Sequence, residues 1–212
     1  MERKVKFADR EYYHLFSRGV EKRKIFLGKT DYERFLALLY ILNQEDHFHV
    51  SNFLNKGQKN ILDIYEQRRS KPLVSIQAYS LMPNHFHLVV QEITDNGISS
   101  FMMKVLTAYS MYFNIKNERS GPLFVRPFRS EHIDNDPYFL HIFNYVHLNC
   151  LDLCEKDWEE KGLKNKERAK EFLNNYRYAS YRDYLGRQRV ESNILDIKAL
   201  PDFVSRAPLD IL

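Results

Sequence analysis

Cysteine is nearly absent from this chain, which has only Cys150 and Cys154 among its 212 residues. Two thiols this close in one predicted helix cannot form a disulfide framework, and without matching ligands they do not make a zinc knuckle. Long apolar runs are missing as well, so no segment is expected to span a bilayer. The first residues, Met-Glu-Arg-Lys-Val-Lys, lack the apolar centre of a secretion signal, and we therefore expect a cytoplasmic protein.

A strong charge of either sign is also missing, since the formal net charge is only +4. Such a balance permits a nucleic-acid partner without requiring one, because binding depends on where Lys and Arg gather. Hydrophobic residues make up 44% and charged residues 28% of the chain, which excludes a disordered or fibrous protein. A chain of 212 residues is long enough for one good core and short for two, so a single domain with appendages is expected.

The periodicity of apolar residues predicts a mixed order of helices and strands without internal repeats. The clearest feature is a hairpin, because residues 72–82 and 85–92 both alternate and the Pro-Asn pair between them favours a tight turn. The other predicted elements are a strand at 11–18 and helices at 31–42, 98–116 and 136–153.

Three segments give weaker or mixed signals. Residues 44–71 are ambiguous, with a short strand at 48–50 and either a helix or a charged insertion at 61–69. Residues 123–132 alternate basic and aromatic side chains, which indicates an exposed strand or loop facing something anionic. The end of the chain, 188–212, is expected to be a loosely packed tail.

His85 and His87 are the most informative residues of the chain. They stand in the run Leu-Met-Pro-Asn-His-Phe-His-Leu-Val-Val at 81–90. Alternate residues of a strand point to the same face, so the two imidazoles share one face while Phe86 points to the other. This arrangement is half of a metal site. The same His-x-His pattern occurs at 47–49, where it lacks the Pro-Asn turn and a partner helix, and we interpret that copy as structural.

The helix predicted after Asp136 presents Tyr145 and Asn149 together, because four residues of α-helix turn by about 400° and leave them about 40° apart. Two neutral imidazoles leave a divalent ion under-coordinated, and the amide oxygen of Asn149 would be a third, hard ligand suited to Mg²⁺ or Mn²⁺. An ion held by His85, His87 and Asn149 would leave positions open for a phosphate oxygen and would polarise a phosphodiester. Tyr145 is then the candidate nucleophile, giving a covalent phosphotyrosine intermediate.

Other tyrosines compete for this role. Tyr109 and Tyr112 lie on the preceding helix, also near an Asn. Tyr145 is preferred because its own helix presents the amide, whereas Tyr112 falls near the apolar stripe. That stripe is predicted to consist of Phe101, Val105, Ala108, Met111 and Tyr112. His147 falls on another face of the helix that carries Tyr145 and is expected to be exposed or structural.

Met-Pro-Asn-His-Phe-His-Leu-Val-Val resembles the HUH motif of the single-tyrosine HUH transposases, which include insertion-sequence transposases and REP-associated tyrosine transposases. Further blocks are similar in the expected order, and they cover about residues 10 to 186. These blocks are Tyr-His-Leu-Phe-Ser-Arg-Gly at 13–19, Asp-Tyr-Glu-Arg-Phe-Leu at 31–36, Gly-Pro-Leu-Phe at 121–124, Arg-Pro-Phe-Arg-Ser at 126–130 and Tyr-Val-His-Leu-Asn at 145–149. The family commonly has Pro after the Asn, where this chain has Cys150.

The resemblance implies an α+β fold of the ferredoxin-like or RRM-like kind, an antiparallel sheet with helices on one face and the active site on the other. It implies one catalytic domain at 1–187, with an insertion of uncertain structure at about 44–71. It also implies single-stranded DNA cleavage and strand transfer at or near DNA hairpins, through a 5′-phosphotyrosine and a free 3′-hydroxyl. Tyr145 would serve the histidine pair of its own chain or, in a homodimer, that of a second copy.

Four arginines are candidates for contact with the DNA: Arg18, Arg126, Arg129 and Arg177. In this interpretation the basic side chains bind phosphates and the aromatic rings stack on unpaired bases. Each stacked base contributes about 1–3 kcal/mol to the binding free energy. Two other functions remain open. The first is a decayed or domesticated protein of the same fold that binds hairpins without cleaving them. The second is a metal-dependent hydrolase that uses activated water in place of tyrosine.

Overall fold

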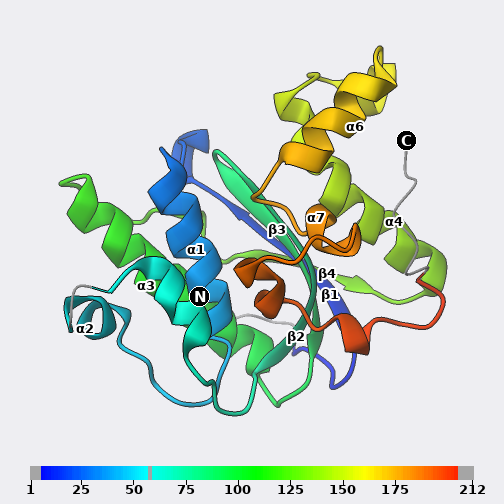
Figure 1. Ribbon diagram of the computed structural model, residues 1–212. Helices are drawn as coiled ribbons and strands as arrows, with labels where there is room; N and C mark the ends of the chain where they lie inside the picture. The colour runs from blue at the N-terminus through cyan, green and yellow to red at the C-terminus, as the bar shows by residue number, and fades with distance from the viewer. Residues whose placement is uncertain (1–5, 57–58, 205–212) are drawn as a thin grey trace.

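The computed structural model describes residues 6–56 and 59–204 (Figure 1). Its centre is a four-stranded antiparallel sheet in the order β2-β3-β1-β4. The strands are β1 (Tyr12–Arg18), β2 (Val74–Met82), β3 (His85–Glu92) and β4 (Arg129–Ile133). With helix α1 (Lys29–Ile41) and helix α3 (Gly97–Lys116), the chain order is β-α-β-β-α-β, which is that of a ferredoxin-like fold. The predicted fold class is confirmed.

The β2-β3 hairpin forms where alternation and the Pro-Asn turn predict it. Its turn is hydrogen-bonded to the segment that follows β1. The Pro83 carbonyl accepts hydrogen bonds from the Ile25 and Phe26 N–H groups at 2.8 and 3.1 Å. The Asn84 carbonyl accepts one from the Gly19 N–H at 2.9 Å. A Cβ at Gly19 would lie 2.4 Å from the Arg23 carbonyl oxygen, so only glycine fits at this close approach.

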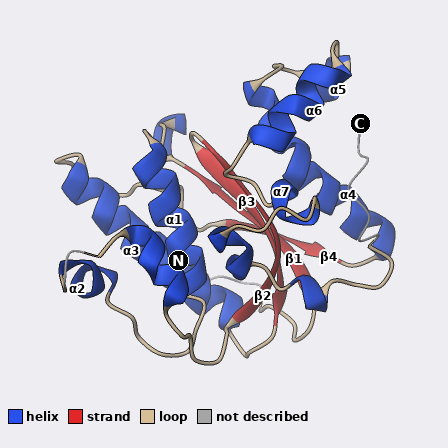
Figure 2. Ribbon diagram, in the orientation of Figure 1, coloured by secondary structure: helices blue, strands red, loops and turns tan. Residues whose placement is uncertain are grey.

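One face of the sheet packs on α1 and α3 (Figure 2). Phe86, Leu88 and Val90 of β3 all point to this face and are fully buried. Because side chains alternate along a strand, the same alternation turns His85 and His87 to the opposite face. That opposite face is not bare, since helix α4 (Asp136–Leu148) crosses it. The members of the second cluster include Ala78 and Val89 from the sheet and Phe139, Phe143 and Val146 from α4.

Residues 44–71 differ from their prediction. The short strand expected at 48–50 is wrong, because Val50 begins a six-residue helix, α2 (Val50–Asn55). Phe48 and Phe53 contact each other at a ring distance of 5.6 Å, so local packing outweighs the strand preference of these residues. The part at 61–69 is a short 3-10 helix, Ile61–Glu66, with buried Ile64 and Tyr65.

The end of the chain is packed rather than loose up to Val204. After α4 and a 3-10 turn (Asn149–Leu153) the chain forms short helices: α5 (Trp158–Lys161), α6 (Lys166–Asn175), α7 (Tyr181–Tyr184) and 3-10 turns at Val190–Ile194 and Ile197–Ala199. Ile194, Leu200 and Val204 are buried against the rest of the molecule. The expected loose tail is therefore corrected for 188–204, and the part beyond lies outside the described residues.

Candidate functional site

The two imidazoles of the His-x-His pair meet on the face of β3 that α4 crosses. Their ring centroids are 5.0 Å apart and the rings are perpendicular. On the neighbouring strand, Arg18 pairs with His85 and Phe16 pairs with His87 in the sheet register. His87 is only 5% exposed, whereas His85 is half-buried. Burial lowers the pKa of both imidazoles, so both are neutral at neutral pH.

Helix α4 brings Tyr145 and Asn149 to this pair. The Tyr145 ring is perpendicular to the His87 ring, with centroids 5.3 Å apart. The Asn149 Nδ2 group donates to the Tyr145 hydroxyl oxygen at 3.3 Å, one helical turn away, and its Oδ1 lies 3.2 Å from His85 Nε2. Four residues that sequence reasoning placed together from two elements therefore lie within one site.

Burial raises the pKa of Tyr145, and the charges of three carboxylates add to this effect: Glu159, Asp152 and Glu131. The hydrogen bond from Asn149 acts in the opposite direction but does not outweigh them. The phenol therefore stays protonated at neutral pH.

The hydrogen bonds of His85 bear on whether a metal would fit. His85 Nδ1 lies 2.7 Å from Asn84 Oδ1, and His85 Nε2 faces Asn149 Oδ1. A neutral imidazole has one N–H, so it donates to only one of these oxygens. With the hydrogen on Nδ1, a lone pair on Nε2 faces another acceptor at 3.2 Å. Two lone pairs about 3 Å apart match neighbouring ligands of an octahedral ion with bonds of about 2.1 Å.

The donor set thus fits a divalent cation: two imidazole nitrogens and one hard ligand, an amide oxygen. Within residues 6–56 and 59–204, no three His, Cys, Asp or Glu side chains gather in a way that could hold a metal ion. The set formed by His85, His87 and Asn149 differs from such a group because its third member is an amide.

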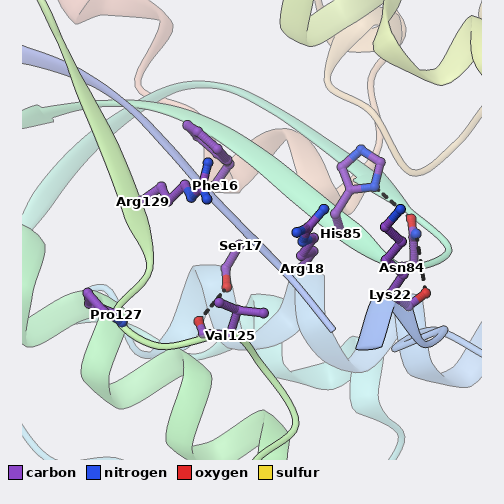
Figure 3. Close-up of a pocket in the computed structure, with 9 residues that line it drawn as sticks. All are labelled: Phe16, Ser17, Arg18, Lys22, Asn84, His85, Val125, Pro127 and Arg129. Carbon is purple, nitrogen blue, oxygen red and sulfur yellow. Dashed lines mark hydrogen bonds between the residues drawn. The ribbon is translucent and has the colours of Figure 1, made fainter. Parts of the chain in front are cut away.

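A cavity of about 320 Å³ opens beside His85 (Figure 3). Arg18, Lys22 and Arg129 supply positive charge to its lining, and Phe16 supplies an aromatic ring. Figure 3 shows Asn84 between His85 and Lys22, with hydrogen bonds to both. Two of the four predicted DNA-contacting arginines therefore lie at the histidine pair.

The other two arginines lie elsewhere. Arg126 is exposed and lines a separate hollow against α3, beside Thr107 and Met111. Arg177 pairs with Glu33 at 3.6 Å and Glu191 at 3.4 Å. Its guanidinium is thus engaged by two buried carboxylates of its own chain.

The competing tyrosines lie on α3, which packs on the other face of the sheet. The Tyr109 hydroxyl is buried and donates to the Ile25 carbonyl at 2.6 Å, and the Tyr112 hydroxyl donates to Asp31 at 2.9 Å. His147 is fully buried, with Nε2 2.9 Å from the Ser180 hydroxyl, so its expected structural role fits its surroundings.

Sequence reasoning missed one residue of the site, His14. It lies on β1, is 3% exposed, and its Nε2 lies 2.8 Å from His87 Nδ1. Its position in an aromatic strand gave no functional signal by itself. Only the pairing of β1 with β3 brings it to the histidine pair.

Comparisons with known proteins bear on the family and the fold of the chain. Residues 48–149 match the model of a family described as "Transposase IS200 like". A solved structure of the REP-associated tyrosine transposase bound to a REP hairpin has the same fold, with a TM-score of 0.53 and 13% identity over 97% of this chain and 99% of that one. No curated protein matches the chain. Over residues 48–149 the chain is similar to the IS200-like transposases, and over nearly its whole length it has the fold of the solved structure.

None of the helices in the described part of the chain is long and apolar enough to cross a bilayer.

Proposed function

We propose that this chain is a transposase-type enzyme that cleaves and rejoins single-stranded DNA at or near hairpins, with Tyr145 as the nucleophile. Mg²⁺ or Mn²⁺ would be held by His85, His87 and Asn149. One observation carries the proposal: a phenol from α4, the amide at the C-cap of that helix and two imidazoles from β3 converge beside a cavity lined with positive charge.

The proposed reaction forms one bond and breaks one. The Tyr145 oxygen attacks the phosphorus atom of a phosphodiester and loses its proton to solvent. The bond from phosphorus to the 3′ oxygen breaks, and that oxygen takes up a proton to leave as a free 3′-hydroxyl. The DNA 5′ phosphate is then joined to Tyr145, and this ester conserves the energy needed for rejoining.

The residues around Tyr145 have distinct tasks in this scheme. Asn149 donates to the phenol oxygen and so fixes where it points. His85, His87 and Asn149 offer two nitrogens and an amide oxygen to a cation. A divalent ion there would polarise the phosphodiester and stabilise the charge that develops on its oxygens. The Tyr145 ring lies against His87 of its own chain, which favours a site formed within one copy.

The proposed DNA path starts at the cavity beside His85. Arg18, Arg129 and Lys22 line it and are suited to phosphate oxygens, and the Phe16 ring is suited to stacking on an unpaired base. Arg126 would extend the path, whereas Arg177, held by two carboxylates, is not assigned a contact here. Hairpins are proposed as the substrate because the structure of similar fold is bound to a REP hairpin.

The decisive experiment is incubation of the full chain with hairpin-bearing single-stranded DNA and Mg²⁺ or Mn²⁺, followed by mass spectrometry of the protein. We expect a covalent adduct on the peptide that contains Tyr145, and its loss when the metal is chelated. Tyr145→Phe should abolish the adduct and lower cleavage at least about a thousandfold, since it removes the attacking oxygen. Tyr112→Phe is the matched control and should keep both the covalent adduct and the cleavage activity.

Other outcomes would assign other functions. Cleavage without any adduct would show a metal-dependent hydrolase that uses water. Hairpin binding without cleavage by the wild type would show a protein that has lost or never had the reaction. Unchanged cleavage by Tyr145→Phe would show that the nucleophile is another residue.

A further inference from the structure

His14 is a buried histidine that touches a proposed metal ligand without belonging to the proposed donor set. His14 Nε2 lies 2.8 Å from His87 Nδ1. The two rings are stacked, with centroids 5.1 Å apart and an angle of 18° between their planes. His14 and His87 are only 3% and 5% exposed, so solvent does not compete for this hydrogen bond.

The sheet extends this contact to a third strand. Glu131 on β4 pairs with His14 on β1, and Phe16, two residues further along β1, pairs with His87 on β3. Residues two apart in a strand share a face, so Glu131, His14 and His87 lie on the same face of the sheet. Glu131 Oε2 is 3.5 Å from His14 Nδ1. A carboxylate, an imidazole and a second imidazole thus form a line across β4, β1 and β3.

We propose that Glu131 and His14 are positioning residues that fix the tautomer and ring orientation of His87, leaving its Nε2 as the nitrogen that binds the metal. This proposal rests on the metal site of the proposed function.

The count of hydrogens supports one tautomer. His14 Nε2 and His87 Nδ1 are 2.8 Å apart, so one of these nitrogens carries the shared hydrogen and the other accepts it, and a neutral imidazole has a single N–H. A carboxylate only accepts, so the His14 hydrogen belongs on Nδ1, facing Glu131. His14 Nε2 then accepts from His87 Nδ1, and His87 Nε2 keeps a lone pair for a cation. In the opposite arrangement His14 Nδ1 would face Glu131 without a hydrogen, and His87 Nε2 would be protonated and unable to bind metal.

His85 is held in a different way, by the Asn84 side chain at 2.7 Å from its Nδ1. Both imidazoles of the pair therefore have a partner at Nδ1, and both present Nε2. Partners of this kind typically contribute about 10–100-fold to metal affinity.

The test measures Mn²⁺ binding to the full chain by titration calorimetry, with thermal melting to confirm folding. His14→Phe keeps a ring beside Phe16 and Tyr145 but removes the acceptor, and should weaken Mn²⁺ binding about 10–100-fold. Glu131→Leu should weaken it in the same direction, whereas Glu131→Gln, which keeps an oxygen of the same reach near His14 Nδ1, should restore much of it. His132→Phe, on the same strand as Glu131 but facing away from the site, is the matched control and should leave it unchanged.

A second readout needs no metal. Long-range ¹⁵N–¹H NMR of the metal-free protein should show His87 with its hydrogen on Nδ1 in the wild type, and a shift towards the Nε2 hydrogen in Glu131→Leu.

A wild-type His87 with its hydrogen on Nε2, or a folded His14→Phe that binds Mn²⁺ like the wild type, would overturn the positioning role. If His14→Phe does not fold, the Glu131 variants decide, because Glu131 is half-exposed on β4. If the wild type binds Mn²⁺ no better than His85→Ala, the proposed metal site is wrong. The NMR result would still decide which nitrogen of His87 carries the hydrogen.

Discussion

Asp31 is a fully buried carboxylate at the start of α1. Its Oδ1 accepts from Lys116 Nζ at 2.6 Å and the Tyr112 hydroxyl at 2.9 Å, and its Oδ2 accepts from the Leu27 N–H at 2.8 Å. Burial alone raises the pKa of this carboxyl, but the hydrogen bonds and the charge of Lys116 together bring the pKa below its usual 3.8. The ionised form is therefore favoured more strongly in the folded protein than in the unfolded chain.

A lowered pKa stabilises the fold above the unfolded pKa, and the effect disappears as pH falls through the folded pKa. Asp31→Asn should therefore lower the free energy of unfolding by about 2 kcal/mol at pH 7, because it removes hydrogen bonds to a charged group. The difference from the wild type should shrink as pH falls below 3.8. Urea unfolding between pH 7 and pH 3 measures it. Asp95→Asn is the control, because it removes only an exposed ion pair with Lys6. It should change the free energy of unfolding by less than about 0.5 kcal/mol at every pH in this range.

Sequence reasoning was weakest for residues whose contacts are with residues far away in the chain. Tyr145 and Asn149 could be paired because helical spacing alone brings them together. His14 could not be found, since its role depends on the register between β1 and β3. Tyr109 is a polar residue by type, yet its hydroxyl reaches a main-chain carbonyl and its ring fills the core. The pattern of apolar residues contains no information on such a bond.

Helix α4 carries the proposed nucleophile, and its start differs by one residue from what the Asp-Pro pair indicates. That pair predicts Asp136 as the N-cap and Pro137 as the first helical residue. In the structure Asn135 is the N-cap, and its side-chain oxygen accepts from the Tyr138 N–H at 2.8 Å. Asp136 is instead the acidic residue of the first turn.

Asn135→Ala should therefore lower the free energy of unfolding by about 1 kcal/mol, because it removes the capping oxygen. Asp136→Ala should cost only a few tenths of a kcal/mol, through its interaction with the helix dipole. Urea unfolding at neutral pH of both variants measures the two effects. A larger loss for Asp136→Ala would place the cap where the Asp-Pro pair indicates it.

Long elements with a clear period of apolar residues could be predicted, whereas it was harder to predict which face of a helix is buried. The stripe predicted for α3 includes Met111, which is 60% exposed, and omits Tyr109, which is fully buried. The buried face consists of Ile98, Phe101, Met102, Val105, Leu106, Tyr109 and Phe113. Ranking by hydrophobicity alone favours a methionine over a tyrosine, although the ring buries more surface and finds a partner for its hydroxyl.

At the scale of the whole molecule, the last described part of the chain contains a buried ion pair whose arginine also contacts the sheet. Arg189 Nη2 lies 2.6 Å from Asp183 Oδ2, and it also donates to the Tyr79 hydroxyl and the Ala179 carbonyl. The Asp183 side chain is 1% exposed. Tyr79 belongs to β2, more than a hundred residues earlier, so the polar sequence around 188 gave no sign of this contact.

Arg189→Met should lower the free energy of unfolding by about 3–5 kcal/mol, because it leaves the Asp183 charge buried without its partner. Arg187→Met is the control: its guanidinium donates to the Asn174 carbonyl at the surface, and its loss should cost less than about 1 kcal/mol. Equilibrium unfolding in urea compares them. Equal stability of the two variants would mean that the segment from 188 is as loosely attached as its composition indicates.

The turn between β2 and β3 has a consequence for how the site assembles. Asn84, which holds His85, is the covalent neighbour of that histidine, so this half of the site acquires its orientation as soon as the hairpin closes. His87 depends on His14, which arrives only when β1 adds to the hairpin edge. One imidazole is thus set by local sequence and the other by tertiary assembly. A folding intermediate that has the hairpin but lacks β1 would hold one prepared ligand and one free to rotate.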